Sequence, residues 1–272
     1  MSTPALEIKQ VSKVFIKKKR GKRFRSAKKE QVVALSGISM SVSRREIFGV
    51  LGPNGSGKST LIRLLSTLLL PDSGTIHIFG HDVEKEAFAV KRLINRVSVD
   101  AAFFKKFSPL ENLAYAARLY GMPIRQAREK MREIMLRLGL KEETFASPME
   151  NMSRGMQQKV AVARGFLTSP TLLLLDEPTT GLDPYSKRDV QGFVREIRET
   201  HRATILLTTH DMEEADRLCD RIAIIDEGRI IALDTPQGLK GSVSRRNGHD
   251  PTLEDVFIEL TGKKMEEKEQ DK

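Results

Sequence analysis

One glycine-rich segment has the residue types and the spacing that can hold a chain of phosphates. Residues 52–60 read GPNGSGKST, which fits the pattern G-x-x-x-x-G-K-[ST], and the apolar run EIFGVL comes directly before them. Glycines let backbone N–H groups curve around a bulky anion without Cβ clashes, and the start of a following helix adds a partial positive charge. We expect Lys58 to reach the β- and γ-phosphates of a nucleotide and Ser59 to bind Mg²⁺. The residues expected to contact the nucleotide here are Gly52, Pro53, Asn54, Gly55, Ser56, Gly57, Lys58, Ser59 and Thr60.

Two adjacent acids end a second apolar run further along the chain. Residues 172–178 read LLLLDEP, so Asp176 and Glu177 lie where a buried strand would end. Asp176 could hold Mg²⁺ through the water shell of the ion, and Glu177 could activate an attacking water. Two acids after a strand carry little information alone, but downstream of the glycine-rich segment they predict the second half of a nucleotide-hydrolysing site.

Strands and helices alternate around these motifs, which predicts a mostly parallel sheet with helices on its faces. The pattern from Leu93 to Met152 is instead helical, and Ser108, Pro109 and Glu111 have the types of an N-cap, a first helical residue and a capping box. We expect strands at residues 6–14, 32–42, 46–51, 171–175, 203–208, 222–225 and 230–233, and helices at 58–69, 124–138, 185–200 and 211–218.

The composition fits a soluble, folded chain. Of the 272 residues, 39% are hydrophobic, which is enough for a core, and the apolar runs are too short to cross a bilayer. The N-terminus lacks the apolar stretch of a signal peptide, and the single cysteine, Cys219, fits a reducing cytosol. We expect any membrane role to come through a partner.

The net charge of +10 is concentrated in a basic segment at residues 17–29, which we expect to form an inserted loop or hairpin. Three interpretations stay open: a solvated loop, a contact with an anionic membrane surface or a partner, and a contact with nucleic acid, which is the least favoured. Residues 263–272 form a charged tail that we expect to be frayed.

Further motifs follow in order. Residues 152–156 read MSRGM, residues 181–183 read GLD, and His210 lies within TTHDMEEA at residues 208–215. With Glu177 directly after the metal-binding aspartate, these motifs resemble the signature, D-loop and switch histidine of the ATP-binding cassette (ABC) family. The resemblance covers residues 6–262 and is closest to the ABC ATPases of drug-, lipid- and polysaccharide-exporting systems.

This resemblance implies an α/β fold: a P-loop NTPase core with a mostly parallel sheet, an antiparallel β subdomain and a helical lobe. It implies a single ABC ATPase domain at residues 1–262. Within that domain, the core would comprise residues 1–92 and 157–240, the helical lobe about 93–156, and a C-terminal helix 252–262.

The resemblance also implies a mechanism. Two copies would sandwich ATP, so that Ser153 and the backbone N–H of Gly155 in one copy reach the γ-phosphate bound by the other. Asp183 would connect the two sites, and Phe15 would stack on adenine. The catalytic roles would fall to Glu177, His210 and Lys58.

The sequence departs from the family pattern in two places. Arg154 replaces the first glycine of the signature pair, while Gly155 remains. The family spacing puts the Q-loop glutamine, which contacts Mg²⁺, at Val99; we hypothesise that Asp100 takes over this contact, and a slow or regulated site is the competing explanation. The nearby run FFKKF at residues 103–107 either contacts a partner or packs the lobe.

The resemblance therefore implies an ATP- and Mg²⁺-dependent ATPase that powers export through a separate membrane-spanning permease. It would act as a homodimer, or as a heterodimer with a paralogous ATPase, and would be cytoplasmic and peripheral at the inner face of the membrane. The alternatives are a non-transport ABC ATPase that acts on nucleic acid or the ribosome, and a regulatory cassette of low activity.

Overall fold

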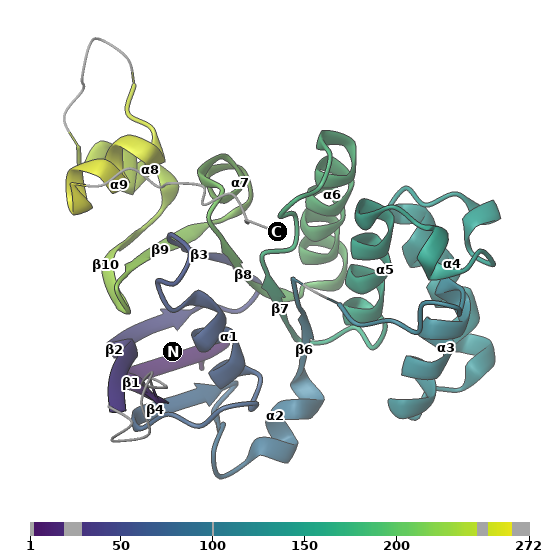
Figure 1. Cartoon of the computed structure of the whole chain (residues 1–272), viewed down its shortest axis with the longest axis horizontal. Coiled ribbons are helices and arrows are strands. Elements are labelled where there is room, and N and C mark those ends of the chain that lie inside the picture. The colour runs from purple at the N-terminus through teal and green to yellow at the C-terminus, as the bar shows by residue number, and fades with distance from the viewer. Residues whose placement is uncertain (1–2, 19–28, 100, 244–249, 263–272) are drawn as a thin grey trace, which may run out of the picture. The chain divides into compact units, whose positions relative to one another are not determined.

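The computed structural model describes residues 3–18, 29–99, 101–243 and 250–262 (Figure 1). By its internal contacts the chain divides into two compact units. Unit 1 comprises residues 1–43, 48–91 and 210–272, and unit 2 comprises residues 44–47 and 92–209.

Unit 1 contains a four-stranded antiparallel sheet in the order β2-β1-β4-β5. Apolar side chains that alternate along the two long strands, such as Leu6, Ile8 and Ile38, are buried, which explains why these segments are extended. The first two strands are longer than the sequence predicts, because the pairing continues to Lys18 opposite Lys29. Of the predicted basic segment 17–29, residues 17, 18 and 29 belong to these two strands, and residues 19–28 lie outside the described residues, so the predicted loop or hairpin stays a prediction. The strands are β1 (Leu6–Lys18), β2 (Lys29–Val42), β4 (Ser73–Ile78) and β5 (His81–Asp82).

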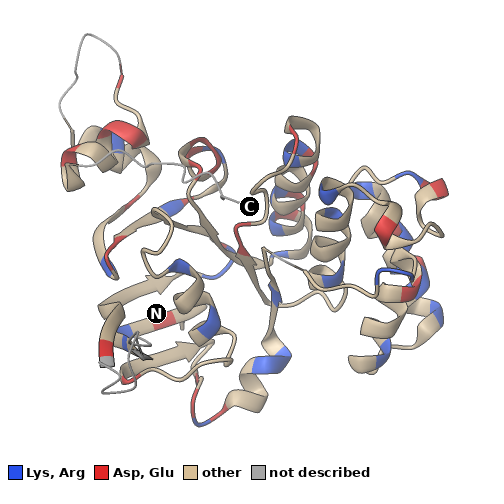
Figure 2. Cartoon of the chain, in the orientation of Figure 1, with Lys and Arg blue, Asp and Glu red and all other residues tan. Residues whose placement is uncertain are grey.

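A second group of strands in unit 1 leads to the glycine-rich segment. β3 (Ile47–Leu51) pairs in parallel with β9 (Arg221–Asp226), which pairs antiparallel with β10 (Arg229–Asp234). Strand β3 is buried throughout and bears no charged side chain, as expected for an interior strand (Figure 2).

The helices of unit 1 are short. α1 (Lys58–Leu65) ends earlier than predicted, because the hydroxyl of Ser66 bonds back to the carbonyl of Ile62 and Thr67 adopts a left-handed conformation. The predicted C-terminal helix is present as α9 (Leu253–Thr261), with Leu253 and Phe257 buried. Leu260 of the same helix is exposed. The others are α2 (Ala87–Leu93), which ends at the border with unit 2, α7 (Met212–Leu218) and α8 (Pro236–Gly241).

Unit 2 is built on three parallel strands. β7 (Leu172–Asp176) lies between β6 (Ile94–Val97) and β8 (Thr204–Thr209). Strands β7 and β8 are buried along their whole length. Around them lie α5 (Arg154–Phe166) and α6 (Pro184–His201), which pack against each other through an edge-to-face contact between Phe166 and Phe193.

The helical part of unit 2 begins later than predicted, because residues 94–97 form strand β6 and not a helix. α3 (Pro109–Leu119) and α4 (Ile124–Arg137) pack on each other and on α5 (Figure 1). The predicted start of α3 is confirmed: the Ser108 hydroxyl accepts from the backbone N–H of Glu111, whose carboxylate in turn accepts from the backbone N–H of Ser108. Two short 3-10 helices, Glu142–Thr144 and Met149–Asn151, lead to α5. In the described ranges, no helix is both long enough and apolar enough to cross a membrane.

Candidate functional site

The glycine-rich segment forms a tight turn between β3 and α1 in unit 1. Gly55 and Gly57 have φ values of 84° and 111°, which L-residues with a side chain rarely adopt. A Cβ on Gly57 would also collide with the carbonyl oxygen of Ala34. The turn therefore depends on glycine for both conformation and space, as the sequence motif predicts.

The side chain of Lys58 is held inside this turn. Its Nζ donates to the carbonyl oxygens of Gly52, at 2.7 Å, and Pro53, at 3.1 Å, and the residue is almost fully buried. The ammonium group therefore lies within the loop itself, where the motif predicts an anion.

The turn also carries a buried polar group with an unmet hydrogen bond. The Ser56 hydroxyl is buried and has no hydrogen-bond partner in the described part of the chain. The Ser56 carbonyl accepts from the backbone N–H of Gly228, which anchors the loop to the hairpin between β9 and β10. A buried hydroxyl without a partner is costly unless a ligand satisfies it, so the loop fits a phosphate. Ser59 is exposed in the first turn of α1, where its hydroxyl is accessible to a metal ion.

In unit 2, the first acid of the second motif lies at the end of β7. The Asp176 side chain is 3% exposed, and its Oδ1 accepts from the Thr208 hydroxyl at 2.9 Å. Its Oδ2 lies 3.4 Å from Nη2 of Arg96, on the neighbouring strand β6. Carboxylate and hydroxyl oxygens are the ligands that Mg²⁺ prefers, so the donors around Asp176 fit this ion.

The second acid, Glu177, adopts a left-handed conformation with φ 48°. Its backbone N–H donates to the Thr208 carbonyl, at 3.0 Å, and its Oε2 accepts from the Thr180 hydroxyl, at 3.1 Å. The bend turns the chain away from the sheet directly after Asp176, and Thr180 orients the carboxylate. A half-buried, oriented carboxylate of this kind can serve as a general base.

The signature and D-loop segments lie together in unit 2. The Ser153 side chain caps α5 by accepting from the backbone N–H of Met156. Gly155, in the first turn, is packed so closely that a Cβ would lie 2.5 Å from the Ser186 hydroxyl and 3.1 Å from Oδ2 of Asp183. Asp183 caps α6, and its pKa is lowered because the carboxylate accepts a hydrogen bond from the backbone N–H of Ser186. The structure thus brings Ser153, Gly155 and Asp183 close to one another.

The remaining predicted site residues are placed singly. Phe15 lies in β1 opposite Val32, half-exposed, with Nζ of Lys13 6.0 Å from its ring centroid. His210 follows β8 directly and precedes Asp211, the N-cap of α7. Asp100 lies outside the described residues, so its predicted contact with Mg²⁺ stays a prediction.

Two residues that contact Asp176 or Glu177 in the structure were not predicted from the sequence. Thr208 contacts both acids, and Arg96 contacts Asp176. The only signal for Arg96 in the sequence is a charged residue within the short segment INRV, which forms the otherwise buried strand β6. The sequence pattern there predicts a helix, so this signal was missed.

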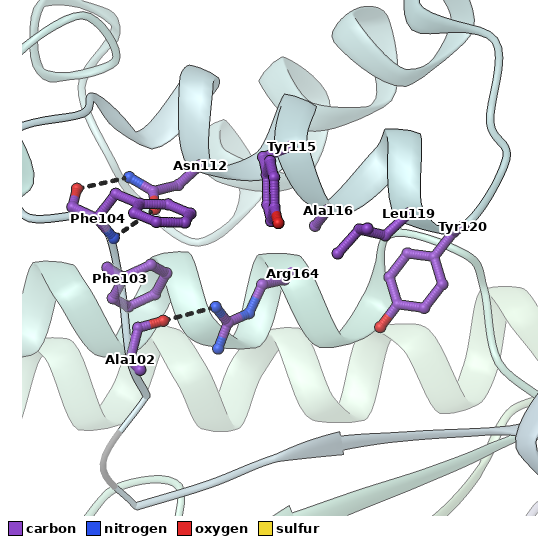
Figure 3. Close-up of a pocket in the computed structure, with 9 residues that line it drawn as sticks. All are labelled: Ala102, Phe103, Phe104, Asn112, Tyr115, Ala116, Leu119, Tyr120 and Arg164. Atoms are coloured by element: carbon purple, nitrogen blue, oxygen red, sulfur yellow. Dashed lines mark hydrogen bonds between the residues drawn. The ribbon is translucent and has the colours of Figure 1, made fainter.

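A pocket of about 440 Å³ opens in unit 2 between the segment after β6 and helices α3 and α5 (Figure 3). The Asn112 side chain fixes its rim by bonding to the backbone N–H and carbonyl of Phe104. Arg164 donates to the Ala102 carbonyl at 2.8 Å, and its guanidinium carbon lies 4.7 Å from the centroid of the Phe103 ring. The residues lining the pocket are Ala102, Phe103, Phe104, Asn112, Tyr115, Ala116, Leu119, Tyr120 and Arg164.

These features define a nucleotide-binding cassette, and comparison with known proteins identifies the family. The chain belongs to the ABC transporter family, whose model matches residues 35–180. It is 43% identical to the daunorubicin resistance ATP-binding protein DrrA3 of Streptomyces coeruleorubidus, over 76% of this chain and 65% of that protein. It is 37% identical to the linearmycin resistance ATP-binding protein LnrL of Bacillus subtilis, over 84% of this chain and 70% of that protein.

Solved structures with a similar fold belong to the same family. The structure of the ATP-binding subunit of an ABC transporter superposes with a TM-score of 0.74 at 27% identity, covering 94% of this chain and 99% of that one. The predicted fold class is confirmed by this likeness. The match spans less than two thirds of the length of the daunorubicin resistance protein.

Proposed function

We propose that this chain is the ATP-binding and ATP-hydrolysing subunit of an ABC transporter, and that it powers export of a substrate through a separate membrane-spanning permease. The observation that carries the proposal is the pair of half-sites in one chain. One is a phosphate loop whose buried Ser56 hydroxyl has no hydrogen-bond partner among the described residues. The other is a buried Asp176 followed by an oriented Glu177. The relatives named for resistance to daunorubicin and linearmycin support the export direction.

The residues of the two half-sites have distinct tasks in this proposal. Lys58 and the N-terminus of α1 bind the β- and γ-phosphates. Ser59 and Asp176 hold Mg²⁺, which when bound neutralises charge on the phosphates. Glu177 accepts a proton from the attacking water, and His210 contacts the γ-phosphate.

The signature segment supports a dimer in which each copy completes the site of the other. Ser153 is exposed at the start of α5, and Gly155 leaves the backbone there without a side chain. A helix N-terminus of this kind attracts an anion. We propose that this end of α5 faces the γ-phosphate bound to a second copy or to a paralogue, and that Asp183 lies at the interface between the two cassettes.

ATP turnover of the purified chain tests this proposal. The comparison is between the unchanged chain and Glu177→Gln, with Glu133→Gln, an exposed acid on α4, as the matched control. We expect the Glu177 variant to lose at least about a hundredfold in turnover, the size of a general-base contribution, and to form a dimer in size exclusion that depends on ATP. Glu133→Gln should behave like the unchanged chain.

If neither the unchanged chain nor the Glu177 variant hydrolyses ATP or dimerises, although both bind it, the motor proposal fails. The regulatory cassette would then be the better interpretation. If nucleic acid, and not a membrane subunit, stimulates the ATP turnover of this chain, the non-transport alternative would be favoured.

We further propose that the permease contacts the aromatic pocket of unit 2, which would place the chain at the cytoplasmic face of the membrane. Phe104, Phe107 and Tyr115 form a chain of ring contacts with centroids 5.2 Å apart, and each is about half exposed. Exposed aromatic rings can bind an apolar side chain of the permease. The half-buried Arg164 beside them can bind a carboxylate of the permease or the carbonyl groups at the end of one of its helices. Burial lowers the pKa of Arg164.

A photoreactive amino acid placed at position 115 tests this contact in cells. We expect an adduct with a membrane protein of several spanning helices, identified by mass spectrometry. The same amino acid at Leu136, which is similarly exposed on α4, is the control and should give no such adduct. Equal labelling from both positions would contradict the pocket as the contact. The predicted membrane-surface contact of residues 17–29 stays a prediction.

A further inference from the structure

Strand β6 places a positive charge directly beside the carboxylate that is proposed to bind Mg²⁺. Arg96 pairs with Leu174 of β7, so Asp176 lies two residues further along the neighbouring parallel strand, on the same face. The long Arg96 side chain extends along the sheet edge to bring Nη2 within 3.4 Å of Oδ2 of Asp176. The two side chains are 21% and 3% exposed, so little water screens the pair.

The burial of Arg96 is not explained by packing alone. Its Nε is buried and has no hydrogen-bond partner among the residues that the structure describes. Partly burying a guanidinium on a strand costs desolvation free energy. The group also keeps its positive charge, because it does not lose its proton at ordinary pH. An apolar side chain would fill this strand position at lower cost, so the charge itself calls for a role.

We propose that Arg96 is a positioning residue of the metal site: a built-in cation that holds Asp176 in place and competes with Mg²⁺ for its Oδ2. This inference rests on the proposed metal-binding role of Asp176. Oδ1 of the same carboxylate is oriented by the Thr208 hydroxyl, so Oδ2 is the oxygen shared between the arginine and the ion. A divalent cation held by Oδ2 then lies close to the positive charge of Arg96.

The consequence is a weakened affinity for the metal ion. Two cations that share one carboxylate repel each other, and partial burial reduces the screening of this repulsion. Removing the charge of Arg96 should therefore tighten metal binding by roughly tenfold. Nucleotide binding without metal should change little, because Arg96 is not among the residues proposed to contact the nucleotide.

Manganese is a suitable probe, because the paramagnetic resonance signal of free Mn²⁺ reports binding without any turnover. The titration is done with the full chain and saturating ADP. We expect Arg96→Gln to bind Mn²⁺ about tenfold more tightly, and Arg96→Lys, which keeps the charge, to stay close to the unchanged chain. Arg132→Gln, which removes an exposed arginine paired with Glu142 at 2.7 Å, is the matched control and should have no effect.

The inference is wrong if Arg96→Gln binds Mn²⁺ no more tightly than the unchanged chain, or if Arg96→Lys shifts as much as Arg96→Gln. Arg96→Met, which suits an apolar strand, replaces the glutamine variant if that one does not fold. Asp176→Asn separates the two proposals. If it keeps the full Mn²⁺ affinity, the metal role of Asp176 fails, whereas a loss there with no gain in Arg96→Gln removes the Arg96 inference only.

Discussion

Replacing Gly49 with alanine is predicted to destabilise the chain through a single identifiable contact. Gly49 lies in the buried strand β3, and an added Cβ would come 2.6 Å from Sγ of Cys219 and 3.3 Å from its Cβ. The Cys219 side chain is short and buried, with a single torsion angle that could move the sulfur, and its Cβ is fixed to the backbone, so the strand or the cysteine must move. Overpacking of this kind costs about 1–3 kcal/mol, less a few tenths gained from the lower chain entropy of alanine.

A double-mutant cycle isolates this contact. Cys219→Ala removes the sulfur and should cost on the order of 1 kcal/mol by itself, as a small loss of buried volume. With the sulfur gone, the new methyl group at position 49 has most of the space it needs. The double variant should therefore be more stable than the sum of the single effects predicts, by about 1–2 kcal/mol.

Urea unfolding followed by far-UV circular dichroism measures these differences, since the chain contains no tryptophan for fluorescence. Gly192→Ala is the matched control: it lies within helix α6, and an added Cβ there meets nothing within 4 Å. That control should stabilise the chain by about 0.5–1 kcal/mol. An unchanged midpoint for Gly49→Ala, or strict additivity with Cys219→Ala, would refute the proposed clash.

Three further predictions concern caps and the pocket rim. Because hydrogen bonding from the backbone N–H of Ser186 lowers the pKa of Asp183, its carboxylate stabilises the fold above the unfolded value near 3.8 and loses this effect as pH falls through the folded value. Urea midpoints from about pH 7 to pH 3 should show a deficit for Asp183→Ala that becomes smaller toward the acid end. Thr252→Ala removes the capping box of α9 and should cost about 1 kcal/mol in urea unfolding, whereas a cost near zero would mean that α9 is held by packing alone. Asn112→Ala removes bonds to Phe104 and should cost about 1–3 kcal/mol and weaken permease labelling from the pocket, an effect that Asn112→Asp should partly rescue.

Sequence reasoning found the elements whose pattern is local. Strands β3 and β7 are continuous apolar runs, and Ser108 starts α3 with a capping box that can be identified from three residue types. The glycine-rich turn was predicted with its flanking strand and helix for the same reason. Each of these signals lies within a few residues of the chain.

The elements that were missed depend on distant partners. Strand β6 contains Asn95 and Arg96, whose polar side chains hide its apolar pattern, and the strand exists because it pairs with β7. Strand β4 is exposed at its first three residues and is held by β1, far back in the sequence. The contact of Arg96 with Asp176 joins residues 80 positions apart, so it follows from strand register and not from any motif.

The left-handed backbone conformation of Glu177 lowers the stability of the fold, while its carboxylate is proposed to be needed for activity. An L-residue with a side chain loses roughly 1–2 kcal/mol in this conformation, a penalty that glycine would not incur. Glu177→Gly should therefore raise the urea midpoint while removing the proposed base, whereas Glu177→Gln should keep the strain. Under selection for stability alone, position 177 would drift toward glycine or asparagine, so a glutamate there records a requirement that the folded chain by itself does not impose.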